Sequence, residues 1–260
     1  MSMLKLEIRG AIIKQINEGN SINKISKSLG LRKSTIYHYY KRIKGRKYNL
    51  VKIPTDDKVI GEFLGVFAGD GNFYFDKKVW HYTLSIYLHR IDDGEYGFYL
   101  KNLIETNFDK KVRIYVQQKK NELRLTFYSK AIYQLIDNYL VIYGNKTLNV
   151  SLKKHFSELS NDFLIYFVKG LVDTDGHVDN FGRIILALIS KDAILQTSNI
   201  LKQFGIETRI SLRKLRPNEH QLYELVIARK NSFKYLELIG FSNKRKEKKL
   251  CASRDSKSRF

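Results

Sequence analysis

The chain contains the stretch Phe63-Leu64-Gly65-Val66-Phe67-Ala68-Gly69-Asp70-Gly71 and, later, the related stretch Phe167-Val168-Lys169-Gly170-Leu171-Val172-Asp173-Thr174-Asp175-Gly176. Each stretch is apolar with the spacing of a helix and ends in Asp-Gly, and an alternating apolar segment typical of a strand follows it. The second Asp lies 105 residues after the first. The repeated unit is therefore a whole small domain, and two such units can bring two carboxylates together.

The glycines of these stretches predict how the two helices pack. Gly65 and Gly69 are four residues apart and share one helix face, which Gly170 continues in the second stretch. Because Gly inside a helix costs about 1 kcal/mol relative to Ala, we expect another backbone to approach closely there. Gly71 and Gly176 are expected to end the helices in the left-handed conformation.

Asp70 and Asp175 fall in the last turn of each predicted helix, where the helix dipole disfavours an acid. A positive partner is needed, and Mg²⁺ is the simplest one, since it binds one or two carboxylates together with water and phosphate oxygens. A solvated Asp-Gly helix end is the alternative.

On these residues the chain resembles a single-chain LAGLIDADG homing endonuclease with two motifs, over residues 58–241. The resemblance implies that Asp70 and Asp175 bind two or more catalytic Mg²⁺ ions. It also implies an α+β fold of two pseudo-symmetric αββαββα repeats, whose antiparallel sheets form a saddle over DNA, in a monomer. The earlier acid of the motif is present as Asp173 but is Ala68 in the first copy.

Lys130 and Lys230 stand at matched places, where the fourth strand of each half meets its last helix. Their placement resembles that of the family's active-site lysines, so we expect them beside the metals; a solvated lysine at a helix start is the alternative. His89 and Ser190, each at the end of a second strand, are weaker candidates for positioning a water molecule.

Alternating polar residues follow the predicted strands, as in an antiparallel sheet with one solvated face. Side chains of these types also reach base edges and phosphates, and strands can lie in a major groove. The residues expected to contact DNA are Thr83, Ser85, Tyr87, Arg113, Tyr115, Gln117, Lys119, Arg124, Thr126, Arg209, Ser211 and Arg213.

Residues 4–43 show the pattern of three short helices, with Gly30 at the turn between the second and the third. The stretch 21–37 resembles the helix-turn-helix DNA-binding domains of site-specific recombinases. A three-helix protein-docking module is the alternative. The recognition helix would contact DNA through Arg32, Lys33, Ser34, Thr35 and His38.

Charge is concentrated at the two ends of the chain. The net charge is +21 over 260 residues, of which residues 1–53 carry +11 and residues 242–260 carry +6. Basic flanks suit a polyanion, because each neutralised phosphate releases counterions, so we expect double-stranded DNA as the partner. Solvated basic tails are the alternative.

Cys251 is the single cysteine, so neither a disulfide framework nor a cysteine zinc site is expected. This favours a reducing compartment, whether cytoplasmic, organellar or nucleoid-associated. No apolar run approaches the roughly 20 residues that span a bilayer, and no membrane partner is expected.

The sequence therefore predicts a metal-dependent, site-specific DNA endonuclease. Its ends do not look like splice junctions, which favours an intron-encoded or freestanding enzyme over an intein. A non-cleaving DNA-binding regulator and an RNA maturase on the same scaffold are the alternatives. The predicted segments are a helix-turn-helix domain at 1–45, a basic linker at 46–57, repeats at 58–148 and 149–241, and a basic tail at 242–260.

Overall fold

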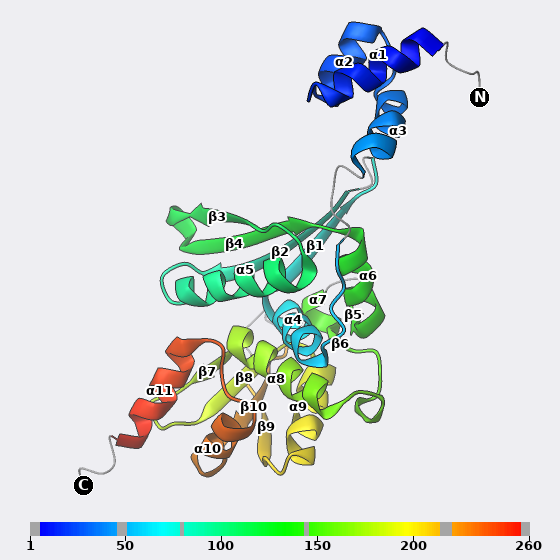
Figure 1. Ribbon diagram of the computed structural model, residues 1–260. Coiled ribbons are helices and arrows are strands. Elements are labelled where there is room, and N and C mark those ends of the chain that lie inside the picture. The colour runs from blue at the N-terminus through cyan, green and yellow to red at the C-terminus, as the bar shows by residue number, and fades with distance from the viewer. Residues whose placement is uncertain (1–5, 46–50, 79–80, 143–145, 214–219, 256–260) are drawn as a thin grey trace. The chain divides into compact units, whose positions relative to one another are not determined.

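The computed structural model describes residues 6–45, 51–78, 81–142, 146–213 and 220–255 (Figure 1). The chain divides into two compact units, residues 1–50 and 51–260. Each unit has its own apolar core.

The N-terminal unit consists of three helices, as the sequence predicts. They are α1 (Leu6–Asn17), α2 (Ile22–Leu29) and α3 (Lys33–Lys44). Ser21 caps α2 by accepting a hydrogen bond from the Lys24 amide, and Gly30 ends it with a φ of 63° in the left-handed region. The buried side chains that hold the three helices together are Ile12, Ile16, Ile25 and Ile36.

The second unit contains two αββαββα repeats, which confirms the predicted repeat architecture. The first is α4 (Asp57–Asp70), β1 (Gly71–Asp76), β2 (His81–His89), α5 (Gly94–Phe108), β3 (Arg113–Gln117), β4 (Glu122–Tyr128) and α6 (Lys130–Tyr139). The second is α8 (Asn161–Asp175), β7 (Gly176–Val178), β8 (Ile184–Leu188), α9 (Lys191–Gln203), β9 (Thr208–Leu212), β10 (Tyr223–Ile227) and α10 (Arg229–Leu238).

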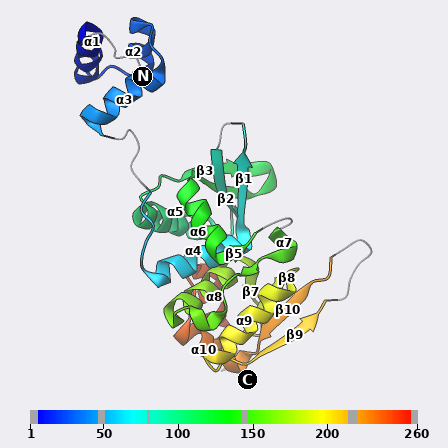
Figure 2. The same ribbon diagram turned by 90° about the vertical axis from the view of Figure 1, so that its right-hand side faces the viewer.

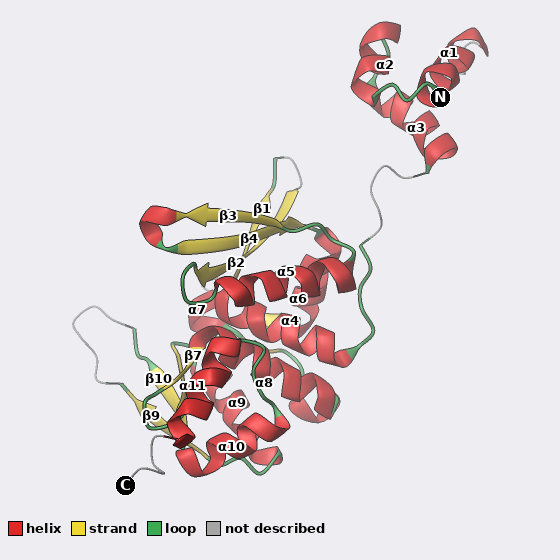
Figure 3. Cartoon of the chain, turned by 60° about the vertical axis from the view of Figure 1, so that its left-hand side comes forward, coloured by secondary structure: helices red, strands yellow, loops and turns green. Residues whose placement is uncertain are grey.

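Each repeat forms its own antiparallel four-stranded sheet. The strand orders are β1-β2-β4-β3 and β7-β8-β10-β9, so the two sheets have the same topology. Helices cover one face of each sheet, and the two sheets lie on opposite sides of the central pair α4 and α8 (Figures 1 and 3).

Short elements connect and complete the repeats. Between the repeats run β5 (Leu140–Val141), α7 (Lys146–Asn149), β6 (Ser151–Leu152) and the 3-10 turn η2 (Phe156–Glu158), and the 3-10 turn η1 (Gln118–Lys120) joins β3 to β4. A further helix, α11 (Lys244–Asp255), follows the second repeat.

Helices α4 and α8 pack backbone against backbone, as their glycines predict. A Cβ on Gly65 would lie 2.9 Å from the Leu171 amide nitrogen, and one on Gly170 would lie 2.8 Å from that of Val66. Gly61, which the sequence analysis did not single out, makes the same kind of contact with the backbone of Phe163 and Phe167.

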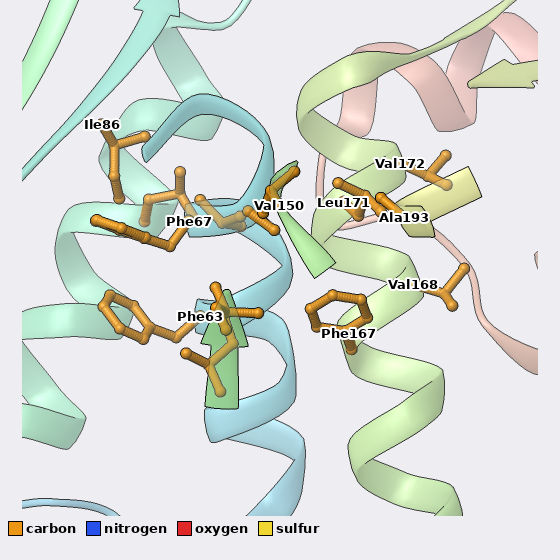
Figure 4. Packing of buried hydrophobic residues seen from close by; sticks show 14 of the residues in the cluster. Phe63, Phe67, Ile86, Val150, Phe167, Val168, Leu171, Val172 and Ala193 are labelled. Carbon is orange, nitrogen blue, oxygen red and sulfur yellow. The ribbon is translucent and has the colours of Figure 1, made fainter. Parts of the chain in front are cut away.

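The apolar faces that flank this contact bury aromatic and branched side chains. Phe63 and Phe67 project from α4 toward the first sheet, whereas Val168 and Val172 project from α8 toward the second repeat (Figure 4). One continuous core therefore includes both repeats.

The predicted conformation of Gly71 and Gly176 is wrong. Their φ values are −76° and −82°, because each is the first residue of a strand rather than a left-handed helix end. The absence of a side chain still matters, since a Cβ on Gly71 would meet the Phe67 ring and one on Gly176 would meet Val172.

Two predicted segment boundaries are also corrected. Residues 244–255 are not a solvated tail but the helix α11, whose Lys246 and Leu250 are buried. Residues 51–56 of the predicted linker belong to the second unit, because Val51 packs on its core and the Lys52 amide donates to the Phe108 carbonyl at 3.2 Å. Residues 46–50 lie outside the described residues.

The alternation of the central strands agrees with the prediction, but the edge strands depart from it. Leu84, Ile86, Leu123 and Leu125 are buried under the helices. At the edges, Val116 of β3 is 52% exposed and Leu212 of β9 is 65% exposed. Strands β9 and β10 run outward from the second repeat (Figure 2).

In the described part of the chain, none of the helices has both the length and the apolar character needed to cross a bilayer.

We expect Gly65→Leu and Gly170→Leu each to lower the free energy of unfolding by about 1–3 kcal/mol or more, because a large side chain cannot enter a backbone contact. Thermal melts of the full chain measure the effect. Gly94→Ala is the matched control, since nothing lies within 4 Å of its Cβ position. Unchanged melting of both leucine variants would contradict this packing.

Candidate active site

The two motif aspartates meet where α4 and α8 end. Asp70 and Asp175 are the last residues of their helices, as predicted, and both are partly buried. A carboxylate oxygen of Asp175 lies 2.7 Å from the Cβ position of Gly69 on the other helix. The small residue at 69 thus makes room for the opposing carboxylate, and Thr174 packs at the same place.

Burial and mutual repulsion make these carboxylates weak acids. Burial, followed by the nearby Asp175 charge, raises the pKa of Asp70 to about 7. Burial raises the pKa of Asp175 to about 6, against the opposing effects of Lys146 and Lys246. Two acids in such a position are poised to exchange their protons for a cation near neutral pH.

Lys146 and Lys246 hold equivalent positions at the two helix ends. The Lys146 Nζ donates to the carbonyls of Phe67, Ala68 and Gly69 at 3.0, 3.0 and 2.6 Å. The Lys246 Nζ donates to those of Val172, Asp173 and Thr174 at 2.9, 2.6 and 3.0 Å. Each ammonium group therefore binds the last carbonyls of one motif helix and offsets its negative end.

The same two lysines are perturbed by their surroundings. Burial lowers the pKa of Lys146 to about 8, although Asp175 and Asp70 act to raise it. Burial likewise lowers the pKa of Lys246, against the charges of Asp173 and Asp93. Basic groups of this kind exchange protons closer to neutral pH than an ordinary lysine does.

The lysines that contact the motif-helix ends are Lys146 and Lys246, not Lys130 and Lys230, which the sequence predicted beside the metals. Lys130 is exposed at the start of α6, and Lys230 is exposed and pairs with Glu207 at 3.2 Å. Neither lysine is among the charged groups that shift the pKa of Asp70 or Asp175. The spacing alone does not separate the two pairs, since Lys130 and Lys230 and likewise Lys146 and Lys246 are 100 residues apart.

Both weaker candidates for positioning a water molecule, Ser190 and His89, already have partners within the protein. Ser190 is 1% exposed, caps α9 and donates to the Val150 carbonyl at 2.7 Å, so it has a structural role. His89 is exposed and contacts the Asp92 carboxylate at 3.1 Å.

A cavity of about 400 Å³ opens beside Asp70. Asn72, Tyr87 and Lys146 line it together with the carboxylate. The partly buried Asp70 therefore faces a cavity lined by strand residues of the first repeat.

The outer face of the first sheet carries many of the residues predicted to contact DNA. Arg124 of β4 pairs across the sheet with Tyr87 and Tyr115 and lies 6.0 and 5.1 Å from their rings. Arg113 lies 5.7 Å from the Tyr128 ring. These contacts hold the guanidinium groups in an aromatic row along the solvent face.

Two predicted contacts on this face are buried. Ser85 and Thr126 are 6% and 4% exposed, and their hydroxyls bond to each other at 3.1 Å across the central strands. They stabilise strand pairing and are not available to a ligand. Lys119 lies in the 3-10 turn η1 and not in a strand, and its side chain is exposed.

The remaining predicted contacts are reachable by solvent. Thr83 is half-buried and Gln117 is exposed on the first sheet; on β9 Arg209 is exposed and Ser211 is half-buried, and Arg213 follows that strand. In the N-terminal unit, four of the five predicted contacts are exposed at the start of α3, and Thr35 is half-buried. The exposed four are Arg32, Lys33, Ser34 and His38.

Residues 162–240 match the family of LAGLIDADG-like domains. An uncharacterized protein of Methanocaldococcus jannaschii is 23% identical over 245 residues, which cover 87% of this chain and 83% of that protein. The replication factor C small subunit of the same organism is 27% identical over 206 residues, but this match covers 78% of the present chain and only 10% of that protein.

Solved structures share the fold. Mesophilic variants of the homing endonuclease I-DmoI align with a TM-score of 0.53 at 22% identity, over 71% of this chain and 96% of theirs. The structure of I-DmoI in complex with DNA and Mn aligns with a TM-score of 0.53 at 21% sequence identity, over 72% of this chain and 98% of that chain. The N-terminal LAGLIDADG domain of DUF199/WhiA aligns with a TM-score of 0.50 at 19% sequence identity, over 74% of this chain and 87% of that chain. The predicted α+β LAGLIDADG fold is confirmed.

The raised pKa values predict a stability that depends on pH. Burial raises the pKa of Asp70 and Asp173 to about 7 and that of Asp175 to about 6, from an ordinary 3.8. The folded protein thus holds these protons more tightly than the unfolded chain does. The resulting stability is fully present below about pH 4 and is lost as pH rises through the folded values.

We therefore expect the melting temperature of the metal-free protein to fall between about pH 5 and pH 8. The double variant Asp70→Asn, Asp175→Asn should show a shallower fall, because two of the three shifted groups are gone. A melting temperature that rises over this range in the unaltered protein would contradict the assignment.

Proposed function

Because the chain carries a LAGLIDADG-like domain over residues 162–240, we propose that it is a site-specific endonuclease that hydrolyses both strands of double-stranded DNA with divalent cations. The observation that carries the proposal is the convergence of Asp70 and Asp175 at the paired ends of α4 and α8. A lysine bound to each helix end completes two equivalent half-sites.

The donor set fits a magnesium ion. Among the described residues, neither the Asp70 nor the Asp175 carboxylate accepts a hydrogen bond, although each feels the charge of nearby groups. Oxygen donors that are few, acidic and open on one side suit Mg²⁺, which keeps waters and substrate phosphates as its other ligands. Among the described residues, no group of three or more acidic, His or Cys side chains is placed to hold a metal ion. Substrate phosphates would supply further oxygen ligands.

When bound, a divalent cation supplies Lewis acidity toward the phosphodiester and toward an attacking water. Asp70 and Asp175 would hold the cations. The ammonium groups of Lys146 and Lys246, fixed by backbone carbonyls, would stabilise the negative charge that develops on the phosphate. With a pKa of about 8, the Lys146 Nζ is also suited to exchange a proton near neutral pH.

DNA binding would use the outer faces of the two sheets. Arg113, Arg124 and Arg209 bring positive charge to these faces, and Tyr87 and Tyr115 bring flat polar side chains. Arginine can bind guanine edges or phosphates, so these residues suit both affinity and base reading.

The N-terminal unit would extend the DNA contact. Its third helix begins with the exposed basic residues Arg32 and Lys33 and is preceded by a short turn at Gly30, as in a helix-turn-helix. Docking of another protein is the competing role for this unit.

We expect Asp70→Asn and Asp175→Asn to abolish cleavage and to leave specific DNA binding within a few-fold of the unaltered protein. Each carboxylate would serve the cation rather than a base or the core. The substrate is a duplex selected from a randomised library by binding to the full chain and then tested for cutting with and without Mg²⁺. Lys130→Met and Lys230→Met are controls, because both side chains are exposed and neither is among the charges that shift the pKa of the two aspartates.

The outcome separates the function classes. Near-normal cutting of both strands by either Asn variant would overturn the shared-cation mechanism. Tight, specific binding of the unaltered protein without cutting at any Mg²⁺ concentration would instead favour a non-cleaving DNA-binding regulator, and preference for RNA would favour a maturase.

We expect deletion of residues 1–50 to leave Mg²⁺-dependent cutting at the same phosphates, since these residues form a separate compact unit. The deletion should weaken binding and flatten its salt dependence, because fewer phosphates are neutralised. Footprinting and salt titration of both forms measure this. Equal footprints and equal salt slopes would leave protein docking as the role of this unit.

A further inference from the structure

The segment Phe241–Lys246, which follows the second repeat, contacts elements of both repeats before it places Lys246. Phe241, Asn243 and Lys246 are all buried. The Ser242 amide donates to Asp173 Oδ2 on α8 at 2.7 Å, and the Ser242 hydroxyl donates to Glu62 Oε1 on α4 at 2.6 Å. One residue thus bonds both motif helices.

Neighbouring side chains strengthen this connection. The Tyr99 hydroxyl of α5 donates to both oxygens of Glu62 at 2.9 and 3.0 Å, and Glu62 itself is 2% exposed. The side-chain amide of Asn243 donates to Asp93 Oδ1 at 2.8 Å, and the Arg245 guanidinium donates to the same oxygen at 3.0 Å. Asp93 immediately precedes α5, so these bonds too run from the second repeat to the first.

Both polar bonds and the packing of Phe241 in the core hold this segment. A cavity of about 630 Å³ lies against it, lined in part by Ile91, Tyr99 and Arg245. Buried hydrogen bonds to charged acceptors are stronger than neutral ones, and their geometry is specific. The bonds of Ser242 and Asn243 therefore fix the start of α11, and the start of α11 sets the position of Lys246.

The described residues of the first repeat, which leave out 143–145, do not show this arrangement. The residue equivalent to Asp173 is Ala68, and the residue equivalent to Glu62 in the second motif is Phe167, whose side chain packs in the core. Lys146 is presented instead by the short helix α7. The two lysines make the same bonds to the helix ends, but different structures position them.

We infer that Asp173, Glu62 and Ser242 are positioning residues that hold Lys246 at the end of α8 and so control the cleavage of one DNA strand. They act through Lys246 and do not touch the substrate. The inference rests on the proposed nuclease function for its strand-specific readout. It explains why an acid is present at 173 although the first repeat has alanine at the matching position.

The experiment compares Asp173→Ala and Ser242→Ala with the unaltered full chain on a duplex labelled on both strands. We expect about tenfold or greater slowing on one strand, with nicked product accumulating, since a misplacement of about 1 Å can cost roughly 100-fold. The slowed strand should be the one slowed by Lys246→Met. Asp173→Asn, which keeps an acceptor for the Ser242 amide, should retain most of the rate.

Asp179→Asn is the matched control, because Asp179 binds Arg183 and backbone amides within the β7–β8 turn. It should lower stability and leave the ratio of the two strand rates unchanged. Equal slowing of both strands by Asp173→Ala and Ser242→Ala, or no slowing at all, would overturn the inference.

A second readout does not depend on cleavage. Acetic anhydride modification followed by mass spectrometry measures the access of reagent to each lysine amine. Lys246 should become several-fold more reactive in Asp173→Ala and Ser242→Ala, while Lys146 stays protected. If the unaltered protein cuts no duplex, the nuclease proposal fails while this readout still tests the positioning; unchanged protection of Lys246 overturns the positioning itself.

Discussion

The direct contact between the backbones of α4 and α8 is the constraint on which the rest of the structure depends. Gly65 and Gly170 allow each helix to touch amide and carbonyl groups of the other. Because both helices end at the same level, Asp70 and Asp175 arrive side by side, and the two sheets are carried outward on either side. A bulky side chain at either glycine would separate the helices and the carboxylates together.

This closeness brings negative charge together, since two carboxylates and two helix C-termini share one small region. Lys146 and Lys246 offset it, each through three carbonyl oxygens. Burial still raises the pKa of Asp70 to about 7, because a buried carboxylate loses its hydration, and the charge of Asp175 adds to this.

The sequence predicts the features that depend on local periodicity. The motif helices, the repeat order and the meeting of Asp70 with Asp175 follow from spacing and from a glycine face. The contacts of Lys146 and Lys246 with the helix ends do not follow from spacing. They depend on the path by which the chain comes back to the motif helices after the last helix of each repeat. The burial of Ser85 and Thr126 was missed for a related reason, since alternation does not tell a central strand from an exposed one.

The location of Lys246 also has a consequence for the order in which the protein is made. Domains fold as units while the chain is being synthesised, with N-terminal parts first. The first repeat has its lysine before residue 150, whereas the second acquires its own only after both repeats have been translated. A nascent chain that has reached residue 240 therefore contains both motif aspartates and Lys146 but not Lys246, so the end of α8 receives its lysine last.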